Sequence, residues 1–512
     1  MPTQKGSPIA ALPTETLSNI FVLSISQTLA HDEPIYPLLL DKTNSPDVLA
    51  QVSRRWREVA LSMPELWSRI TLSPHPRAIS MFLQHKQQDK DTTRGCFERW
   101  LERSKNASLY IDLNPNLHVP DEIYASFLIP SLLDALERHV NRLRDLRVTE
   151  TQSPHNIPIV RPDITAPRLE RVVLRPSLTK VGWIPIQVSL FKNAPKLSHL
   201  SLPVSYTIRI YGLPWHQLTH LNIDDQDYQG PQFFRDLPAI FAKCRNLVTL
   251  RANIASSGGK VTYDDSGCGP RAILLPKLQS LAILGRVDIV EFLVAELSSS
   301  SSLPKLRTLV INCEAEHTFS QRLLFFVRLH SDTLRHLYLH GAPKPGLSPS
   351  VFYQICSSLP RLTKLSLNAY ILSVPLATAL TLRPSPFVSS TTRTLEGGLN
   401  PFISSFTMVL PPNHQNIDVP LVGGTLLRGP YAAAVEGVAF MVQSRWRLPQ
   451  SLTENGSAAR LEEVSLEKSQ WDWMARSAPN AYARIKACVG EGLRLSFDVE
   501  DDDQLREFDW YR

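Results

Sequence analysis

The fold of this chain is decided by the stretch PKLRTLVI at residues 304–311. Its apolar pattern, Leu-x-x-Leu-x-Leu with Ile, Val or Ala sometimes replacing Leu, returns at residues 334–339 and 362–367 in steps of 28 residues. The last two apolar positions of this motif are two residues apart, so on a strand they point to the same side of a sheet. One strand cannot bury that side alone, whereas stacked copies of the motif can. The motif therefore predicts a repetitive α/β structure with one strand in each copy.

The motif continues along most of the chain. Its copies begin at Leu143, Leu169, Leu197, Leu218, Leu247, Leu278, Leu306, Leu334 and Leu362, with a degenerate copy at Leu109 and a late one at Leu461. Room remains between strands for a helix, and we expect helices at residues 233–243, 288–297, 320–330 and 348–358. The pattern is typical of a leucine-rich-repeat solenoid, with parallel strands on a concave face and helices on a convex face. An ordinary α/β fold is the alternative.

The rhythm of the motif fails between residues 368 and 461. Residues 383–394 are rich in Pro, Ser and Thr, which predicts an irregular or partly disordered insert over residues 383–430. Weaker elements are expected in and after this insert, namely strands at 406–410 and 421–427, helices at 431–446 and 481–488, and a closing strand at 493–497. The irregular solenoid is thus expected to span residues 96–512.

A second dense pattern lies near the N-terminus. It consists of LPTETLSNIF at residues 12–21, LAQVSRRWREVA at 49–60 and MPELWSRI at 63–70. Apolar residues recur at helical spacing in the first two segments, which predicts two amphipathic helices, the second running from Leu49 to Ala60. A helical unit of this size cannot bury all of these side chains by itself. Its apolar stripes are expected to pack either on the solenoid, as a cap, or on another protein.

In order and residue type, the three segments together resemble an F-box, especially that of the large fungal F-box proteins. The resemblance implies an F-box domain at residues 8–72 with a long loop at 24–46. It also implies docking onto the Skp adaptor of cullin–RING ubiquitin ligases through Leu12, Pro13, Leu17, Ile20, Phe21, Leu49, Val52, Ser53 and Trp56. The chain is then expected to be the substrate-recognition subunit of an SCF-type (Skp–cullin–F-box) E3 ubiquitin ligase, whose solenoid binds a target protein. The alternative is an interaction scaffold that acts without cullin.

Composition and charge argue against several other classes of protein. The 512-residue chain has a net charge of +6 and no segment that concentrates basic residues, so we expect no nucleic-acid partner. Its six cysteines include no C-x-x-C pair, which favours free thiols in a reducing compartment. We find no secretory signal and no apolar run approaching about eighteen residues. The chain is therefore expected in the cytoplasm, the nucleus or both, without a membrane partner.

No catalytic or cofactor-binding motif accompanies these patterns, so we expect neither an enzyme nor a cofactor. His216 and His220 have the helical spacing of metal ligands, as do His336 and His340. Both pairs fall across expected strands, where residues four apart lie about 13 Å from one another along the chain. We therefore expect no metal site.

Target binding is expected on the concave face. Interfaces favour aromatic and arginine anchors, which makes Arg251 and Tyr338 candidate target-binding residues. Tyr338 lies between two motif leucines and is therefore expected to point away from the core. The Lys or Arg that follows a proline before many strands is interpreted as a solvated charge at the rim of the array, not as a site.

Overall fold

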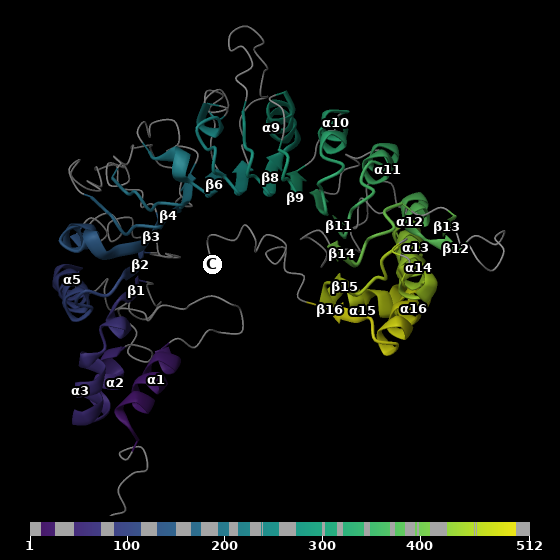
Figure 1. Ribbon diagram of the computed structural model, residues 1–512. Helices are drawn as coiled ribbons and strands as arrows, with labels where there is room; N and C mark the ends of the chain where they lie inside the picture. Colours follow the sequence, from purple (N-terminus) through teal and green to yellow (C-terminus); the bar gives the residue numbers. More distant parts are fainter. Residues whose placement is uncertain are drawn as a thin grey trace, which may run out of the picture. The chain divides into compact units, whose positions relative to one another are not determined.

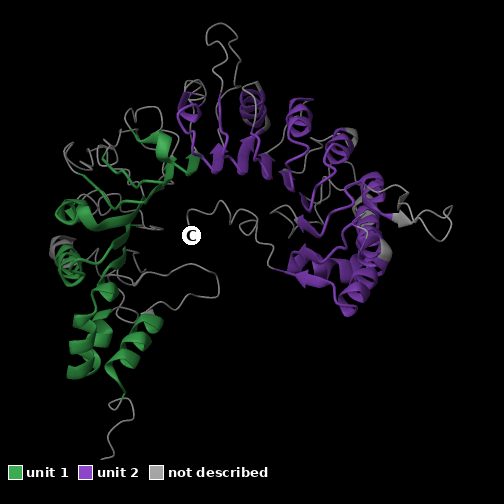
Figure 2. Ribbon diagram, in the orientation of Figure 1, with its two compact units in different colours: residues 1–224, 511–512 green, residues 225–510 purple. Residues whose placement is uncertain are grey.

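The architecture follows from the computed structural model (Figure 1). The structure describes residues 12–25, 46–72, 86–113, 131–149, 165–175, 193–203, 213–225, 237, 239–254, 273–299, 303–314, 321–341, 349–368, 374–384, 395–396, 399–409, 428–454, 456 and 458–497. The chain divides into two compact units, unit 1 from Met1 to Asp224 and unit 2 from Asp225 to Trp510 (Figure 2).

Unit 1 begins with short helices. They are α1 (Thr14–Ile25), α2 (Pro46–Val52), α3 (Arg54–Ser62) and the 3-10 helix η2 (Pro64–Trp67). The single helix expected from Leu49 to Ala60 was wrong, because the chain breaks at Ser53, whose backbone is extended with φ −156° and ψ 167°. The hydroxyl of Ser53 accepts a hydrogen bond from the amide of Trp56 at 3.1 Å and caps α3.

The rest of unit 1 is a parallel sheet whose strands lie side by side in chain order. The strands are β1 (Arg69–Leu72), β2 (Leu109–Leu113), β3 (Leu143–Thr149), β4 (Arg171–Arg175), β5 (His199–Pro203) and β6 (His220–Asp225). Helix α5 (Lys86–Arg103) connects β1 to β2, and the 3-10 helices η3 (Val140–Arg142) and η5 (Trp215–Gln217) lead into β3 and β6. Because each strand pairs with the next motif copy, unit 1 grows by repetition.

Unit 2 is built on the same plan, with parallel strands side by side in chain order. Its strands are β7 (Thr249–Ile254), β8 (Ser280–Arg286), β9 (Thr308–Glu314), β10 (His336–Gly341), β11 (Lys364–Asn368), β14 (Ser405–Val409), β15 (Glu463–Leu466) and β16 (Arg494–Ser496). Two short strands, β12 (Arg383–Pro384) and β13 (Leu395–Glu396), form a separate antiparallel pair.

Helices of unit 2 lie on one side of these strands (Figure 1). They are α9 (Val287–Ser299), α10 (Gln321–Leu329), α11 (Pro349–Ser357), α12 (Val374–Leu380), α13 (Arg428–Trp446), α14 (Gln450–Glu454), α15 (Lys468–Ser477) and α16 (Pro479–Gly490). Helices α9, α10 and α11 coincide with three of the expected helices. Of the fourth, at residues 233–243, the structure describes 237 and 239–243, and residues 237 and 239–241 are helical. The strand expected at 421–427 lies outside the described residues.

The motif leucines form the core between strands and helices. In the copy at Leu306 the three apolar side chains, Leu306, Leu309 and Ile311, are fully buried. Leu309 is in register with Leu281 on β8 and Leu337 on β10, so equivalent positions of successive copies stack on one another. The mixed α/β class with a long parallel sheet, built in solenoid-like fashion from repeats, is therefore confirmed within each unit.

One strand lies inside the segment that we expected to be an irregular insert. Strand β14 pairs in parallel with β11 and with β15, so it is an ordinary member of the sheet. Ile403, Phe406 and Met408 are buried and have the spacing of the motif, with no leucine among them. The 383–430 insert is thus interrupted by a regular repeat. Residues 411–427 of it lie outside the described part of the chain.

The sheet also begins earlier than the sequence indicated. Strand β1 pairs with β2 in parallel, with Ile70 opposite Ile111. Trp67, Ile70 and Leu72 have the spacing of the motif, and Trp67 and Ile70 are fully buried. The last residues of the range expected for the F-box therefore form the first strand of the array. No helix within the described residues is both long enough and apolar enough to cross a membrane.

Candidate partner-binding surfaces

The predicted adaptor-binding residues divide into buried and exposed groups. Leu17 and Phe21, one turn apart on α1, are fully buried. The ring of Phe21 lies 5.0 Å from that of Trp56 on α3, and Trp56 is half-buried. The guanidinium of Arg55 donates to the carbonyl of Leu12 and ties the start of α1 to α3. Leu17, Phe21 and Trp56 therefore hold the small helical bundle together.

Other predicted residues face outward from the same helices. Ile20 on α1 is 40% exposed and Val52 at the end of α2 is 57% exposed. Pro13 and Ser53 are also exposed, whereas Leu12 and Leu49 are half-buried. Val22 and Leu23, which no sequence pattern marked as binding residues, are 40% and 68% exposed. Large aliphatic side chains that remain in water on so small a bundle mark a candidate docking surface.

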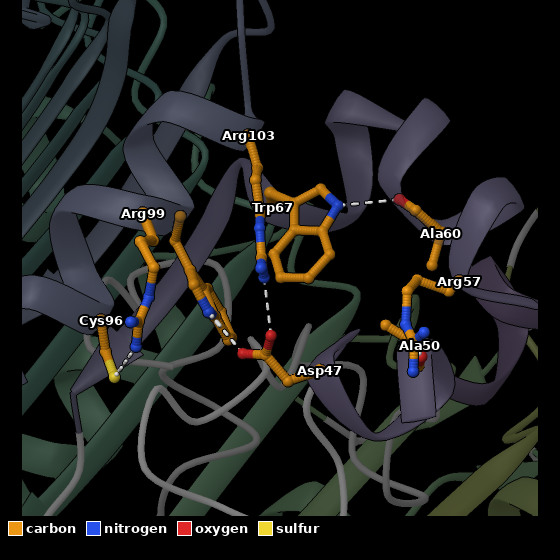
Figure 3. Close-up of polar contacts among 9 residues, drawn as sticks. Asp47, Ala50, Arg57, Ala60, Trp67, Cys96, Arg99 and Arg103 are labelled. Atoms are coloured by element: carbon orange, nitrogen blue, oxygen red, sulfur yellow. Dashed lines mark hydrogen bonds and ion pairs between the residues drawn. The ribbon is translucent and has the colours of Figure 1, made fainter. Parts of the chain in front are cut away.

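The opposite side of the bundle is joined to α5 (Figure 3). The carboxylate of Asp47 accepts from the indole of Trp100 at 2.9 Å and from Arg103 at 2.6 Å. The indole of Trp67 donates to the carbonyl of Ala60 at 2.8 Å and meets the ring of Trp100 edge to face at 5.7 Å. The guanidinium of Arg103 lies 4.3 Å above the ring of Trp67. These contacts fix the helices to the start of the array.

The helix-free face of unit 2 contains both predicted target-binding residues. Side chains alternate along a strand, so Tyr338, between the buried Leu337 and Leu339, points away from the helices. In register with Tyr338 lie Val310 on β9 and Ala282 on β8, and Ala282 is opposite Arg251 on β7.

Arg251 and Tyr338 thus share one row across the sheet but are separated by two strands. At about 4.8 Å per strand their backbones are about 14 Å apart. Arg251 is only 9% exposed, and Tyr338 is half-buried against a small apolar cluster of Ala282, Leu284 and Val310. The structure therefore brings the two residues onto one face without bringing them into contact. Whether they bind a target stays a prediction.

Several histidines and cysteines among the described residues are buried or half-buried, and burial shifts their pKa values. Burial lowers the pKa of His336 to about 4 and raises that of the Cys244 thiol to about 12. None of Cys96, Cys244, Cys313, Cys356 and Cys488 forms a disulfide. Within the part of the chain that the structure describes, no group of three or more His, Cys, Asp or Glu side chains is placed to hold a metal ion.

Comparison with known proteins adds no family assignment. No protein-family model matches the chain, and no curated protein matches it. The resemblance to F-box proteins accordingly depends on the residues of the N-terminal segments and on their order.

Proposed function

We propose that the chain is the substrate-recognition subunit of an SCF-type E3 ubiquitin ligase. In this proposal the N-terminal helices are an F-box that binds the Skp adaptor, and the repeats are a leucine-rich-repeat solenoid that binds the target protein. The observation that carries the proposal is the exposed aliphatic surface of Ile20, Leu23 and Val52, on a bundle whose other side is already attached to α5.

A simpler role for these helices is to cap the first strand of the array, as terminal repeats of solenoids do. A cap accounts for the buried side, where Trp67, Trp100 and Asp47 join the bundle to α5. Capping repeats, however, present a polar outer face to water. Ile20 and Val52 do the opposite, since they leave large apolar surfaces uncovered. A second protein that covers them would gain about 25 cal/mol for each Å² of apolar surface removed from water.

The proposed mechanism is proximity. A target held on the solenoid and a conjugating enzyme held through the adaptor would belong to one complex, which raises the effective concentration of the target lysine near the enzyme. The chain would supply affinity and orientation, while the chemistry would take place on its partners.

Affinity purification from a cell extract tests this proposal. The full-length chain is expected to recover a Skp adaptor together with a cullin. A variant with Ile20→Ser and Val52→Ser should lose both, because it removes exposed apolar contacts without opening the core. Trp56→Ala is a poorer probe, since Trp56 packs on the buried ring of Phe21.

The same experiment includes a matched control and decides between the two sequence-based functions. Phe325→Ser with Leu329→Ser removes apolar side chains that are 57% and 52% exposed on α10 and should leave the recovery unchanged. Recovery of the adaptor without cullin would favour the interaction scaffold. Absence of the adaptor from the wild-type preparation would contradict both functions.

A further inference from the structure

A row of cations lies along the edge of the unit 2 sheet at which β9, β10 and β11 begin. Arg307 and Arg335 each follow the first leucine of their motif copy, and the amide of Arg335 donates to the carbonyl of Arg307 at 2.8 Å. In the next copy Arg361 and Lys364 flank the equivalent position, and the amide of Lys364 donates to the carbonyl of Arg335 at 3.0 Å. We call Arg307, Arg335, Arg361 and Lys364 the basic edge. Its members are distributed over strands that lie about 4.8 Å apart.

Arg307, Arg361 and Lys364 are exposed, and no member of the edge forms an ion pair with a described carboxylate. Arg335 is half-buried and donates to the backbone carbonyl of Asp332 at 2.9 Å. The carboxylate of Asp332 acts against the lowering of the pKa of Arg335 by burial but forms no ion pair with it.

At two other places in the repeats a cation near the start of a strand pairs with a carboxylate. In unit 1, Arg144 at the start of β3 pairs with Glu170 at 2.7 Å. At the far end of the unit 2 sheet, Arg494 lies 3.9 Å from Glu463. These two pairs contrast with the basic edge, where four cations on three successive copies form no ion pair with a described carboxylate.

The cations of the basic edge also repel one another. Burial lowers the pKa of Arg335, and the positive charges of Arg361 and Arg307 lower it further. Burial likewise lowers the pKa of the neighbouring His336 to about 4, with contributions from Lys364, Arg307 and Arg335, so His336 is neutral at pH 7. An anionic ligand would relieve this repulsion. Guanidinium groups also match carboxylates in shape, since they can donate two parallel hydrogen bonds.

The surroundings of the basic edge favour an acidic peptide over a nucleic acid. Proteins that bind single-stranded nucleic acids combine cations with aromatic side chains on which the bases stack. Among the described residues of β9, β10 and β11, the one Tyr, Trp or Phe is Tyr338, and it packs on the apolar cluster of Ala282, Leu284 and Val310. An extended peptide rises about 3.3 Å per residue, while the strands that carry the cations are about 4.8 Å apart. Because Arg and Lys side chains are long and flexible, they can still reach the carboxylates of such a peptide.

We propose that the basic edge binds a carboxylate-rich segment of a partner protein. This proposal deepens the proposed function by giving the chemistry of the target. That the bound partner is a target for ubiquitin transfer rests on the proposed function, whereas the binding itself needs no adaptor. The sequence-based interpretation of these residues as solvated rim charges agrees with the exposure of Arg361. That interpretation did not include the strand register, which places the cations of successive copies beside one another.

Fluorescence anisotropy with the purified full-length chain tests the proposal. The probe is a short labelled Glu-rich peptide, and the matched neutral probe has Gln at each Glu position. The Glu-rich peptide should bind, more weakly as salt is added, and the neutral peptide should not.

Variants then locate the binding surface. A triple variant with Arg307→Gln, Arg335→Gln and Arg361→Gln should weaken binding about tenfold or more, since several charge pairs are lost together. A control variant removes the same net charge from exposed helix positions through Arg328→Gln, Arg476→Gln and Lys486→Gln. The control should bind within about twofold of the wild type because none of its charges is a member of the basic edge.

Several results would overturn the proposal. They are unchanged binding by the triple variant, no binding of the Glu-rich peptide by the folded wild type, and tighter binding of a single-stranded RNA through the same residues. If circular dichroism shows that the triple variant does not fold, the pair Arg361→Gln and Lys364→Gln replaces it, because both side chains are exposed. Adaptor binding is measured separately on the same preparations, so a chain that binds the peptide but no adaptor contradicts the proposed function alone.

Discussion

At the scale of single residues, Arg445 shows how a buried charge organises an irregular part of unit 2. Its side chain is fully buried, and its guanidinium donates to the carbonyls of Leu380 at 2.9 Å, Asn400 at 3.0 Å and Leu399 at 2.6 Å. Burial lowers the pKa of Arg445 to about 10, so it stays charged at pH 7. One side chain thus ties the end of α12 to Leu399 and Asn400, which precede β14.

Replacing Arg445 should be severely destabilising. Arg445→Ala removes three hydrogen bonds to the carbonyls of Leu380, Leu399 and Asn400 and opens a cavity, so the free energy of unfolding should fall by about 3 kcal/mol or more. Arg447→Ala is the control, because it removes the same charge from an exposed ion pair with Glu491 and should have a far smaller effect. Denaturant titration of both variants measures the difference. Equal losses would show that the buried hydrogen bonds of Arg445 contribute little.

A second prediction at this scale concerns His330 at the end of α10. Burial lowers the pKa of His330 to about 4, and its ring lies 4.7 Å from that of Phe326. An unfolded histidine binds a proton near pH 6.5, so between these two values protons favour the unfolded chain. The contribution of His330 to the free energy of unfolding is therefore fully present above pH 6.5 and is lost as the pH falls, by about 2 kcal/mol at pH 5. The midpoint temperature of thermal unfolding should therefore decline less steeply from pH 7 to pH 4.5 for His330→Gln than for the wild type. Parallel declines would contradict this role of His330.

At the scale of single elements, Gly285 in β8 shows how closely neighbouring strands approach. Its φ of +135° is unfavourable for other residues, and a Cβ added there would lie 2.0 Å from the carbonyl oxygen of Ile254 on β7. Gly285→Ala should therefore push the two strands apart and lower the free energy of unfolding by about 2–4 kcal/mol. Gly95→Ala on α5 is the control, since a Cβ there meets no atom within 4 Å and should stabilise the helix by about 0.5–1 kcal/mol. Denaturant titration should give opposite signs for the two variants.

The cap at the junction of α2 and α3 can be tested by substitution of Ser53. Ser53→Ala should lower the free energy of unfolding by about 1 kcal/mol, because α3 loses its cap. Ser53→Asp should keep most of that stability, since a carboxylate caps equally well. If both variants lose the same stability in thermal unfolding, the capping role of Ser53 is wrong.

The sequence predicted elements well where leucines repeat and poorly where other residues take their place. The strands after Leu306 and Leu334 follow directly from the motif. Strand β14 confirms the weak strand expected at residues 406–410, but it was not recognised as a regular copy of the motif, because Ile403, Phe406 and Met408 fill the motif positions without a leucine. Spacing and apolar character, instead of leucine alone, identify it as such a copy.

The candidate site was harder to predict because burial depends on packing between elements. Leu17 and Ile20 belong to one helical stripe in the sequence, yet Leu17 is fully buried and Ile20 is 40% exposed. The direction in which α3 packs on α1 decides between them, and no local pattern encodes that direction. The basic edge was missed for a similar reason, since its members are distant in sequence and meet only through the strand register.

At the scale of the whole molecule, the N-terminal helices are the part of unit 1 with apolar side chains on two sides. One side is attached to α5 through Asp47 and Trp67, and the other presents Ile20, Leu23 and Val52 to water. Each unit otherwise buries its motif residues between strands and helices. The account as a whole depends on a partner that covers the exposed side of the N-terminal helices.

Calorimetric titration of the purified chain with a purified Skp adaptor tests this claim most directly. Saturable binding is expected, with a dissociation constant of about 1 μM or less and with affinity at least about tenfold weaker for the variant carrying Ile20→Ser and Val52→Ser. The Phe325→Ser and Leu329→Ser variant should bind like the wild type. No heat of binding from the folded wild type, or equal affinity for all three proteins, would contradict the account.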